Sequence, residues 1–224
     1  MKSLTISLSC AVSVLTLSIL ASPVVFADAG AAATGLEALE QAPAQASAVE
    51  LLHLVSPATS TLSAPVDVQF AIDGDELKAH FEVRTKEIFA HEHLAKGEYP
   101  YQFDVVELFV SVAGQASPFP YYEFEVSPYG ETFQVKIPGG GKPFQDGIDV
   151  GSKAIVHRVK GSWSADLSIK LSRLGYDGDR SKLVGNAFAV LGKKPLRSYW
   201  SLSLPHQDKP NFHKPEFFRP LFAE

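Results

Sequence analysis

The sequence predicts an all-β protein, an antiparallel β-sandwich of jelly-roll or immunoglobulin type with about nine or more strands. From about residue 50 onward, short runs of alternating apolar and polar residues follow one another, and turn-forming residues separate them. No region has sustained apolar spacing at the helical period. Hydrophobic residues make up 46% of the 224 residues, which is enough for a packed core. Many strands with few helices between them favour two antiparallel sheets packed face to face.

The first 27 residues have the pattern of a secretory signal peptide. Lys2 supplies a positive charge, residues 4–20 are uncharged, and a small-residue pattern ends at Ala27. A membrane anchor is the alternative, but no positively charged stop-transfer cluster follows the apolar run. We therefore expect cleavage near Ala27 and a periplasmic or extracellular protein with no membrane association afterwards. The Ala-rich residues 28–49 contain no aromatic residue and are expected to form a flexible leader.

The cysteine and methionine content and the net charge of the chain exclude several classes of function. The single cysteine, Cys10, and the single methionine, Met1, both lie in the predicted signal peptide. The cleaved chain would therefore have no disulfide, no thiol catalysis, no thiolate metal site and no Met ligand for haem. The formal net charge of −5 argues against a nucleic-acid partner, because such proteins usually carry a basic surface.

The individual strands can be assigned in order along residues 50–224. The expected strands are 66–72, 77–85, 104–112, 121–127, 132–137, 154–160, 162–171, 183–191 and 198–204. The turn at 73–76 joins the first two into a hairpin, and the three glycines at 139–141 open a loop. Residues 173–176 are expected to form one helical turn.

Three glutamates share one predicted sheet face. Alternation puts Glu107 opposite the apolar row of strand 104–112, and it puts Glu123 and Glu125 opposite that of strand 121–127. If these strands pair, one sheet face is apolar and the other combines carboxylates with aromatic residues. One interpretation is a solvated outer face. The other is a sugar-binding surface, where rings stack on sugars and carboxylates accept hydrogen bonds from hydroxyls. Glycoside hydrolysis by Glu107 with Glu123 or Glu125 is a third possibility.

Two segments resemble the family 9 carbohydrate-binding modules and their DOMON-like relatives. Residues 101–110 are similar to that family's aromatic-x-x-Asp-x-Val-Glu strand, and residues 121–130 are similar to the strand that follows it. Residues 212–218 resemble its closing Phe-His-x-Pro-x-x-Phe segment. The resemblance covers about residues 50–224.

This resemblance implies a β-sandwich that binds oligo- or polysaccharide without cleaving it, in support of carbohydrate breakdown, with bound calcium in a mainly structural role. Tyr101 and Phe212 match the two rings that clamp a sugar, where the sugar-binding members carry Trp. Glu107 matches a carboxylate that bonds sugar hydroxyls. Glu125 and Ser127 match polar ligands that are Arg and Asn in those members. These departures weaken the stacking and reverse the charge at position 125.

The DOMON-like relatives suggest a second function, a periplasmic module that binds haem or another redox group. Without methionine, such a module would need histidine ligands. His91 and His93, two residues apart, and His213 are the candidates. A surface pair at positions 91 and 93 is the alternative interpretation, since the surrounding sequence is typical of a loop.

Overall fold

Two antiparallel β-sheets, of five and seven strands, form the part of the chain that the structure, a computed structural model, describes: residues 52–55, 65–205, 207 and 211–222. All of these residues belong to one compact unit, Ala46–Glu224. The predicted signal peptide (1–27) and leader (28–49) lie outside the described residues. Within the described ranges, no helix is both long and apolar enough to cross a membrane.

The first sheet has the strand order β1-β2-β3-β9-β8. Its strands are β1 (Leu52–His53), β2 (Val66–Asp73), β3 (Glu76–Arg84), β8 (Lys153–Val159) and β9 (Ser162–Lys170). The predicted hairpin is confirmed, with Asp73 paired to Glu76 across a two-residue turn. Gly74 occupies that turn at φ +58°, a left-handed conformation that glycine adopts without steric cost.

The second sheet has the order β11-β10-β4-β5-β6-β7, with β12 also paired to β10. Its strands are β4 (Val105–Ser111), β5 (Tyr121–Val126), β6 (Thr132–Ile137), β7 (Gln145–Asp146), β10 (Val184–Leu191), β11 (Ser198–Ser201) and β12 (Arg219–Pro220). All nine expected strands are found, eight of them with shifted ends. The two-residue strands β1, β7 and β12 were not expected, because alternation cannot be recognised over two residues.

Short helical elements connect the strands. They are η1 (Pro100–Gln102), α1 (Leu171–Leu174), η2 (Arg180–Lys182) and η3 (Pro215–Phe217). The helical turn expected at 173–176 is α1, which begins two residues earlier. It ends because Gly175 follows it in the left-handed conformation, at φ 84°, and caps the preceding carbonyls.

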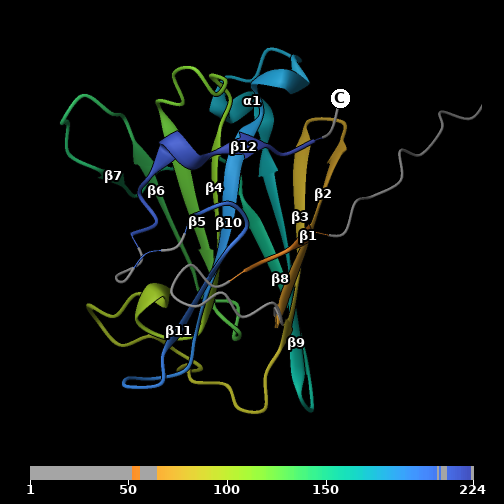
Figure 1. Cartoon of the computed structure of the whole chain (residues 1–224), viewed down its shortest axis with the longest axis vertical. Coiled ribbons are helices and arrows are strands. Elements are labelled where there is room, and N and C mark those ends of the chain that lie inside the picture. Colours follow the sequence, from red (N-terminus) through yellow and green to blue (C-terminus); the bar gives the residue numbers. More distant parts are fainter. Residues whose placement is uncertain (1–51, 56–64, 206, 208–210, 223–224) are drawn as a thin grey trace, which may run out of the picture. The chain divides into compact units, whose positions relative to one another are not determined.

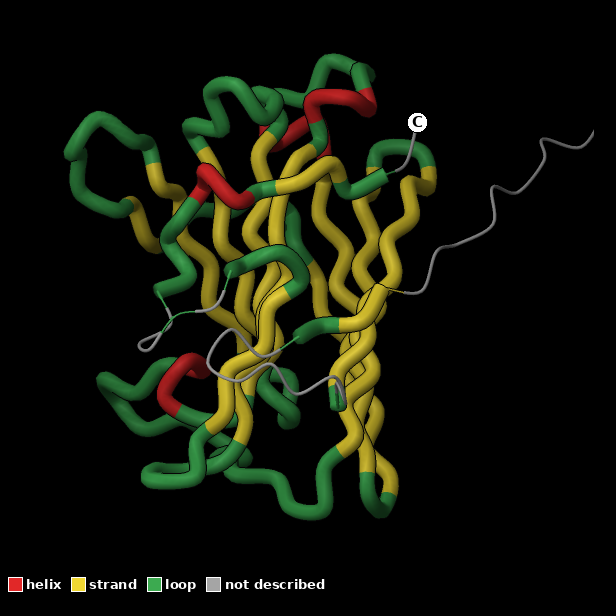
Figure 2. The backbone as a smooth tube through the Cα atoms, viewed as in Figure 1, coloured by secondary structure: helices red, strands yellow, loops and turns green. Residues whose placement is uncertain are grey.

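The main core lies between the two sheets, as expected for a β-sandwich. Phe81 and Trp163 of the first sheet belong to the same buried cluster as Leu108 and Phe124 of the second sheet. Figure 1 shows the two layers, with β2, β3, β8 and β9 in one and β4, β5, β6 and β10 in the other, and Figure 2 shows the loops that join them. Face-to-face packing of this kind explains why each central strand buries one complete row of apolar side chains.

The outer face of the second sheet carries a second apolar cluster, formed by Phe109, Tyr121, Val135, Ile137, Val184, Phe188, Leu204 and Phe218. The predicted alternation is confirmed, since Glu107, Glu123 and Glu125 lie on this face. The interpretation of a solvated face is wrong, because these side chains are only 3%, 6% and 1% exposed. This face is not solvated because the C-terminal segment packs on it. Phe218 belongs to the apolar cluster, and Phe212 and Phe217 pack against it.

Asp104, in the aromatic-x-x-Asp motif, has a structural role. It is completely buried, and its carboxylate accepts hydrogen bonds from the backbone N–H of Phe89 (2.9 Å) and of Gly192 (2.5 Å). It therefore joins the loop before β4 to the residue that follows β10. Burial raises the pKa of Asp104, although these two N–H bonds oppose the shift.

Replacing Asp104 by Ala is expected to lower the free energy of unfolding by about 2 kcal/mol, because two backbone N–H groups lose their acceptor. Urea denaturation at pH 7 measures the change. The exposed Asp177→Ala variant, which loses surface contacts to Lys182 and to the backbone N–H of Asp179, is the control and should change stability by less than about 0.5 kcal/mol. Equal effects in the two variants would contradict the structural role of Asp104.

Candidate binding pocket

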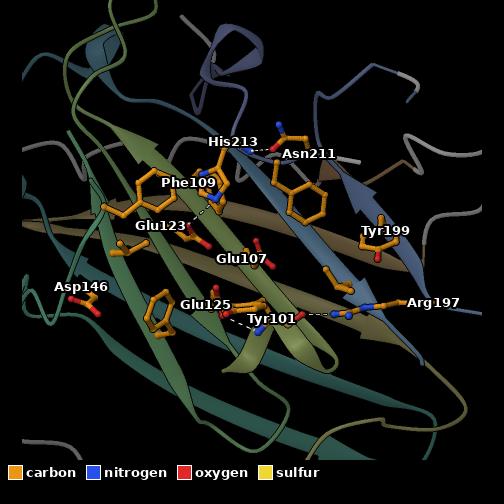
Figure 3. Close-up of a pocket in the computed structure, with 15 residues that line it drawn as sticks. Tyr101, Glu107, Phe109, Glu123, Glu125, Asp146, Arg197, Tyr199, Asn211 and His213 are labelled. Atoms are coloured by element: carbon orange, nitrogen blue, oxygen red, sulfur yellow. Dashed lines mark hydrogen bonds and ion pairs between the residues drawn. The ribbon is translucent and has the colours of Figure 1, made fainter. Parts of the chain in front are cut away.

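A pocket of about 700 Å³ opens on the outer face of the second sheet. Its lining residues come from η1, strands β4–β7, β10 and β11, the residues just before β7 and β11, and residues 211–213 (Figure 3). They are Tyr101, Glu107, Phe109, Glu123, Glu125, Phe133, Val135, Phe144, Asp146, Val190, Arg197, Tyr199, Asn211, Phe212 and His213. This volume is in the range typical of small-molecule sites, about 300–1,000 Å³.

Three carboxyl groups lie together in this pocket because of strand register. Glu107 of β4 pairs directly with Glu125 of β5. Glu123 lies two residues before Glu125, so it occupies the same face of the strand. Figure 3 shows the three side chains in the middle of the pocket, with Tyr101 below them and His213 above.

The pKa values of all three carboxyl groups are raised. Burial is the main cause for each. The pKa of Glu107 is well above its ordinary value, through burial and the charge of Glu123, while the charge of Arg197 opposes the shift. The pKa of Glu123 rises to about 7, and that of Glu125 to about 11, helped by the charges of its two neighbours. At neutral pH Glu125 is therefore protonated, and its carboxyl group can donate a hydrogen bond as well as accept one.

The two oxygens of Glu125 have different partners. Oε2 accepts a hydrogen bond from the backbone N–H of Tyr101, at 2.9 Å, which ties the strand to η1. Oε1 is buried and has no hydrogen-bond partner in the described part of the chain. A buried polar atom without a partner is uncommon in proteins, and it often marks a functional position.

Arg197 brings a cation to the same pocket. Its guanidinium group donates hydrogen bonds to the carbonyl oxygens of Tyr101 and Phe103. Its Nε atom is buried and lacks a hydrogen-bond partner among the residues that the structure describes. Sequence reasoning missed Arg197, since it lies outside the motifs and reaches the pocket from the connection between β10 and β11.

His213 lies on the opposite side of the pocket from Arg197 (Figure 3). Its Nδ1 is 2.9 Å from the hydroxyl oxygen of Tyr121, and its Nε2 is 3.7 Å from a carboxyl oxygen of Glu123. Partial burial lowers the pKa of His213, which favours the neutral imidazole at pH 7. The imidazole therefore contributes a hydrogen-bonding group to the pocket rather than a fixed charge.

Aromatic rings form the walls. Tyr101 stacks on Tyr99, with ring centroids 5.4 Å apart and planes 8° from parallel. Phe212 stacks on Phe188, at 4.2 Å and 14°, and meets the edge of Tyr199. Stacking on a neighbour fixes the orientation of each ring before a ligand binds, which reduces the entropy lost on binding.

Four of the five residues predicted to bind carbohydrate line this pocket: Tyr101, Glu107, Glu125 and Phe212. The structure does not bring Ser127 into the pocket. Its hydroxyl oxygen instead accepts hydrogen bonds from the backbone N–H groups of Tyr129 and Glu131, so it stabilises the turn between β5 and β6. Carbohydrate binding by these residues stays a prediction.

The histidines considered as haem ligands have different surroundings. His91 Nδ1 lies 3.0 Å from Glu98, and His93 Nδ1 lies 3.6 Å from Glu131, whereas His213 is in the pocket. Haem binding stays a prediction. No group of three or more His, Cys, Asp or Glu side chains in the described ranges is arranged to hold a metal ion. Calcium binding stays a prediction, since backbone and amide oxygens also serve as calcium ligands.

Comparison with known proteins supports the fold assignment. No protein-family model matches the chain. A protein of Arthroderma benhamiae named "Extracellular protein" is 27% identical over 174 residues, which cover 69% of this chain and 76% of that protein. Among solved structures, a Bacteroides uniformis protein assigned to carbohydrate binding has a TM-score of 0.60 and 23% identity, over 76% of this chain and 84% of that one.

Two solved structures of a family 9 carbohydrate-binding module from Caldicellulosiruptor kristjanssonii are also similar. The complex with glucose has a TM-score of 0.51 and 13% identity, over 75% of this chain and 82% of the module. The complex with cellotriose has a TM-score of 0.50 and 14% identity, over 75% and 80%. This chain therefore has the fold of the family 9 modules, which confirms the fold implied by the motifs.

Proposed function

We propose that this chain is a secreted, non-catalytic carbohydrate-binding module that holds a sugar in the pocket on its second sheet and supports polysaccharide breakdown. One observation carries the proposal: buried carboxyl groups and pre-oriented aromatic rings line the same pocket of about 700 Å³. The carbohydrate-binding assignment of one neighbour, the glucose and cellotriose complexes of another, and the name of the extracellular relative support it.

The two kinds of lining group have complementary roles toward a sugar. The faces of Tyr101 and Phe212 offer apolar surface to the C–H groups of a pyranose ring. The carboxyl groups of Glu107 and Glu125 and the guanidinium group of Arg197 offer hydrogen bonds to its hydroxyl groups. A pocket that combines apolar walls with a few converging polar groups is typical of specific small-molecule binding.

Replacing Phe212 or Tyr101 by Ala is expected to weaken sugar binding about tenfold or more, because each change removes apolar contact area with the sugar ring. Quenching of intrinsic fluorescence, titrated with glucose and cellotriose, measures the affinity. Tyr129→Ala is the matched control, since this aromatic residue stacks with Arg158 and does not line the pocket.

Flat titrations of the wild-type protein across a glycan panel would contradict the proposed function. Release of reducing sugar from a bound oligosaccharide would contradict the non-catalytic part, and it would point to Glu107 with Glu123 or Glu125 as the catalytic pair.

A further inference from the structure

The carboxyl and basic groups of the pocket are unequally paired with one another. Those that line it are the carboxyl groups of Glu107, Glu123, Glu125 and Asp146, the guanidinium of Arg197 and the imidazole of His213. The charge of Arg197 stabilises ionised Glu107, and the imidazole of His213 lies 3.7 Å from Glu123. The carboxyl group of Glu125 instead contacts the backbone amide of Tyr101 and the neighbouring carboxyl groups.

Glu125 is also the least exposed of these carboxyl groups, at 1%. Glu125 lines the pocket, and its buried Oε1 has no hydrogen-bond partner among the described residues. In the empty pocket this carboxyl group avoids the cost of a buried charge by keeping its proton, which it shares with Glu123. A cationic ligand group would compensate the charge and occupy the unpartnered oxygen at the same time.

We propose that the preferred ligand is an amino sugar with a free, protonated amine, and that its ammonium group lies against Glu125 and Glu123. This inference rests on the proposed function and specifies its substrate class. An ammonium group has three donors, and three carboxyl groups, those of Glu107, Glu123 and Glu125, line the same pocket. The same set of carboxyl groups disfavours uronic acids and sulfated sugars, because like charges in a buried site repel strongly.

Binding of such a ligand is coupled to proton release. Near pH 7, Glu125 carries a proton in the empty pocket and becomes a carboxylate when the ammonium group binds. The amine keeps its own proton, and the proton of Glu125 passes to the buffer. Glu123, whose pKa is about 7, is half-protonated before binding and also faces the ammonium group. The count is therefore between one and about one and a half protons released per amino sugar bound, and close to zero for a neutral sugar.

Isothermal titration calorimetry of the full-length protein at pH 7 tests this, with glucosamine, glucose, N-acetylglucosamine and glucuronate as probes. Glucosamine is expected to bind about tenfold or more tightly than glucose, consistent with a charge-assisted hydrogen bond. Acetylation of the amine should remove the gain, and glucuronate should bind most weakly. Titration in buffers with different ionisation enthalpies counts the protons released and requires no variant.

Glu125→Gln provides the test by mutation. Gln has the same shape and retains an acceptor for the N–H of Tyr101, but it cannot become an anion. The ratio of glucosamine to glucose affinity is expected to fall to about 1, and proton release should disappear. Glu82→Gln is the matched control, because it removes an exposed carboxylate on β3 that does not line the pocket. It should leave the ratio and the proton count unchanged.

The outcomes separate this inference from the proposed function. If glucose binds as tightly as glucosamine, or if no proton is released, the amino-sugar inference is wrong and the carbohydrate-binding function stands. If ethylammonium binds as tightly as glucosamine, the pocket recognises amines and not sugars, which overturns the inference. If none of the sugars binds, both proposals fail.

Discussion

Replacing Glu123 by Gln is expected to stabilise the folded protein by about 3 kcal/mol at pH 7. The pKa of Glu123 is raised from 4.5 to about 7 in the folded state, chiefly by burial. The folded protein therefore binds more protons than the unfolded chain. Stability from this group is highest below about pH 4.5 and falls as the pH rises toward 7. Gln has no proton to lose, so the variant should not show this decrease.

Urea denaturation at pH 4.5, 5.5 and 7 measures the effect as a difference between wild type and variant, which cancels the contribution of other titrating groups. The exposed Glu92→Gln variant is the control, and it should follow the wild-type pH dependence. The same pH dependence in wild type and Glu123→Gln would show that Glu123 does not titrate in this range. The variant should also bind sugar more weakly, because Glu123 lines the pocket.

Opposite effects on stability and binding would explain the burial of three carboxyl groups on a sheet face that also carries an apolar cluster. A buried charge without full compensation destabilises a fold, and such groups are kept mainly where function needs them. The expected result therefore links the energetics of the fold to the pocket.

Replacing Gly185 by Ala is expected to destabilise the protein by about 3 kcal/mol or more. A Cβ atom at this position would lie 2.3 Å from the carbonyl oxygen of Phe109 and 3.2 Å from a methyl group of Leu221. The Phe109 carbonyl belongs to the backbone of β4, which pairs with β10 at this point, so it cannot move without separating the strands. Because β4 and β10 both line the pocket, sugar binding should weaken as well.

Thermal and urea denaturation measure the stability of this variant. Gly140→Ala is the control, since a Cβ at that position meets nothing within 4 Å. Gly140 has φ +62°, so the control reports the backbone conformational effect alone, about 1 kcal/mol. Gly185→Ala with stability equal to that of the control would contradict the steric argument.

Most of the fold could be predicted from local sequence, because the alternation of a strand depends only on neighbouring residues. Strand β6 agrees with the prediction at both ends, and the assignment of Leu108 and Glu107 to opposite faces is confirmed. The short strands β1, β7 and β12 could not be predicted, because they exist only through pairing with distant strands. Trp163 and Trp200, the two tryptophans of the chain, are both buried.

The sequence by itself determined the β-sandwich, the face on which Glu107, Glu123 and Glu125 lie, and the motifs that mark Tyr101 and Phe212. Only the tertiary structure decided that this face is covered and that Arg197 enters the pocket. The reason is that period-two alternation assigns a side chain to a face, while its environment depends on segments far away in the sequence. Residues near 212 cover strands that begin about a hundred residues earlier, and that cover removes water from the carboxyl groups and raises their pKa values.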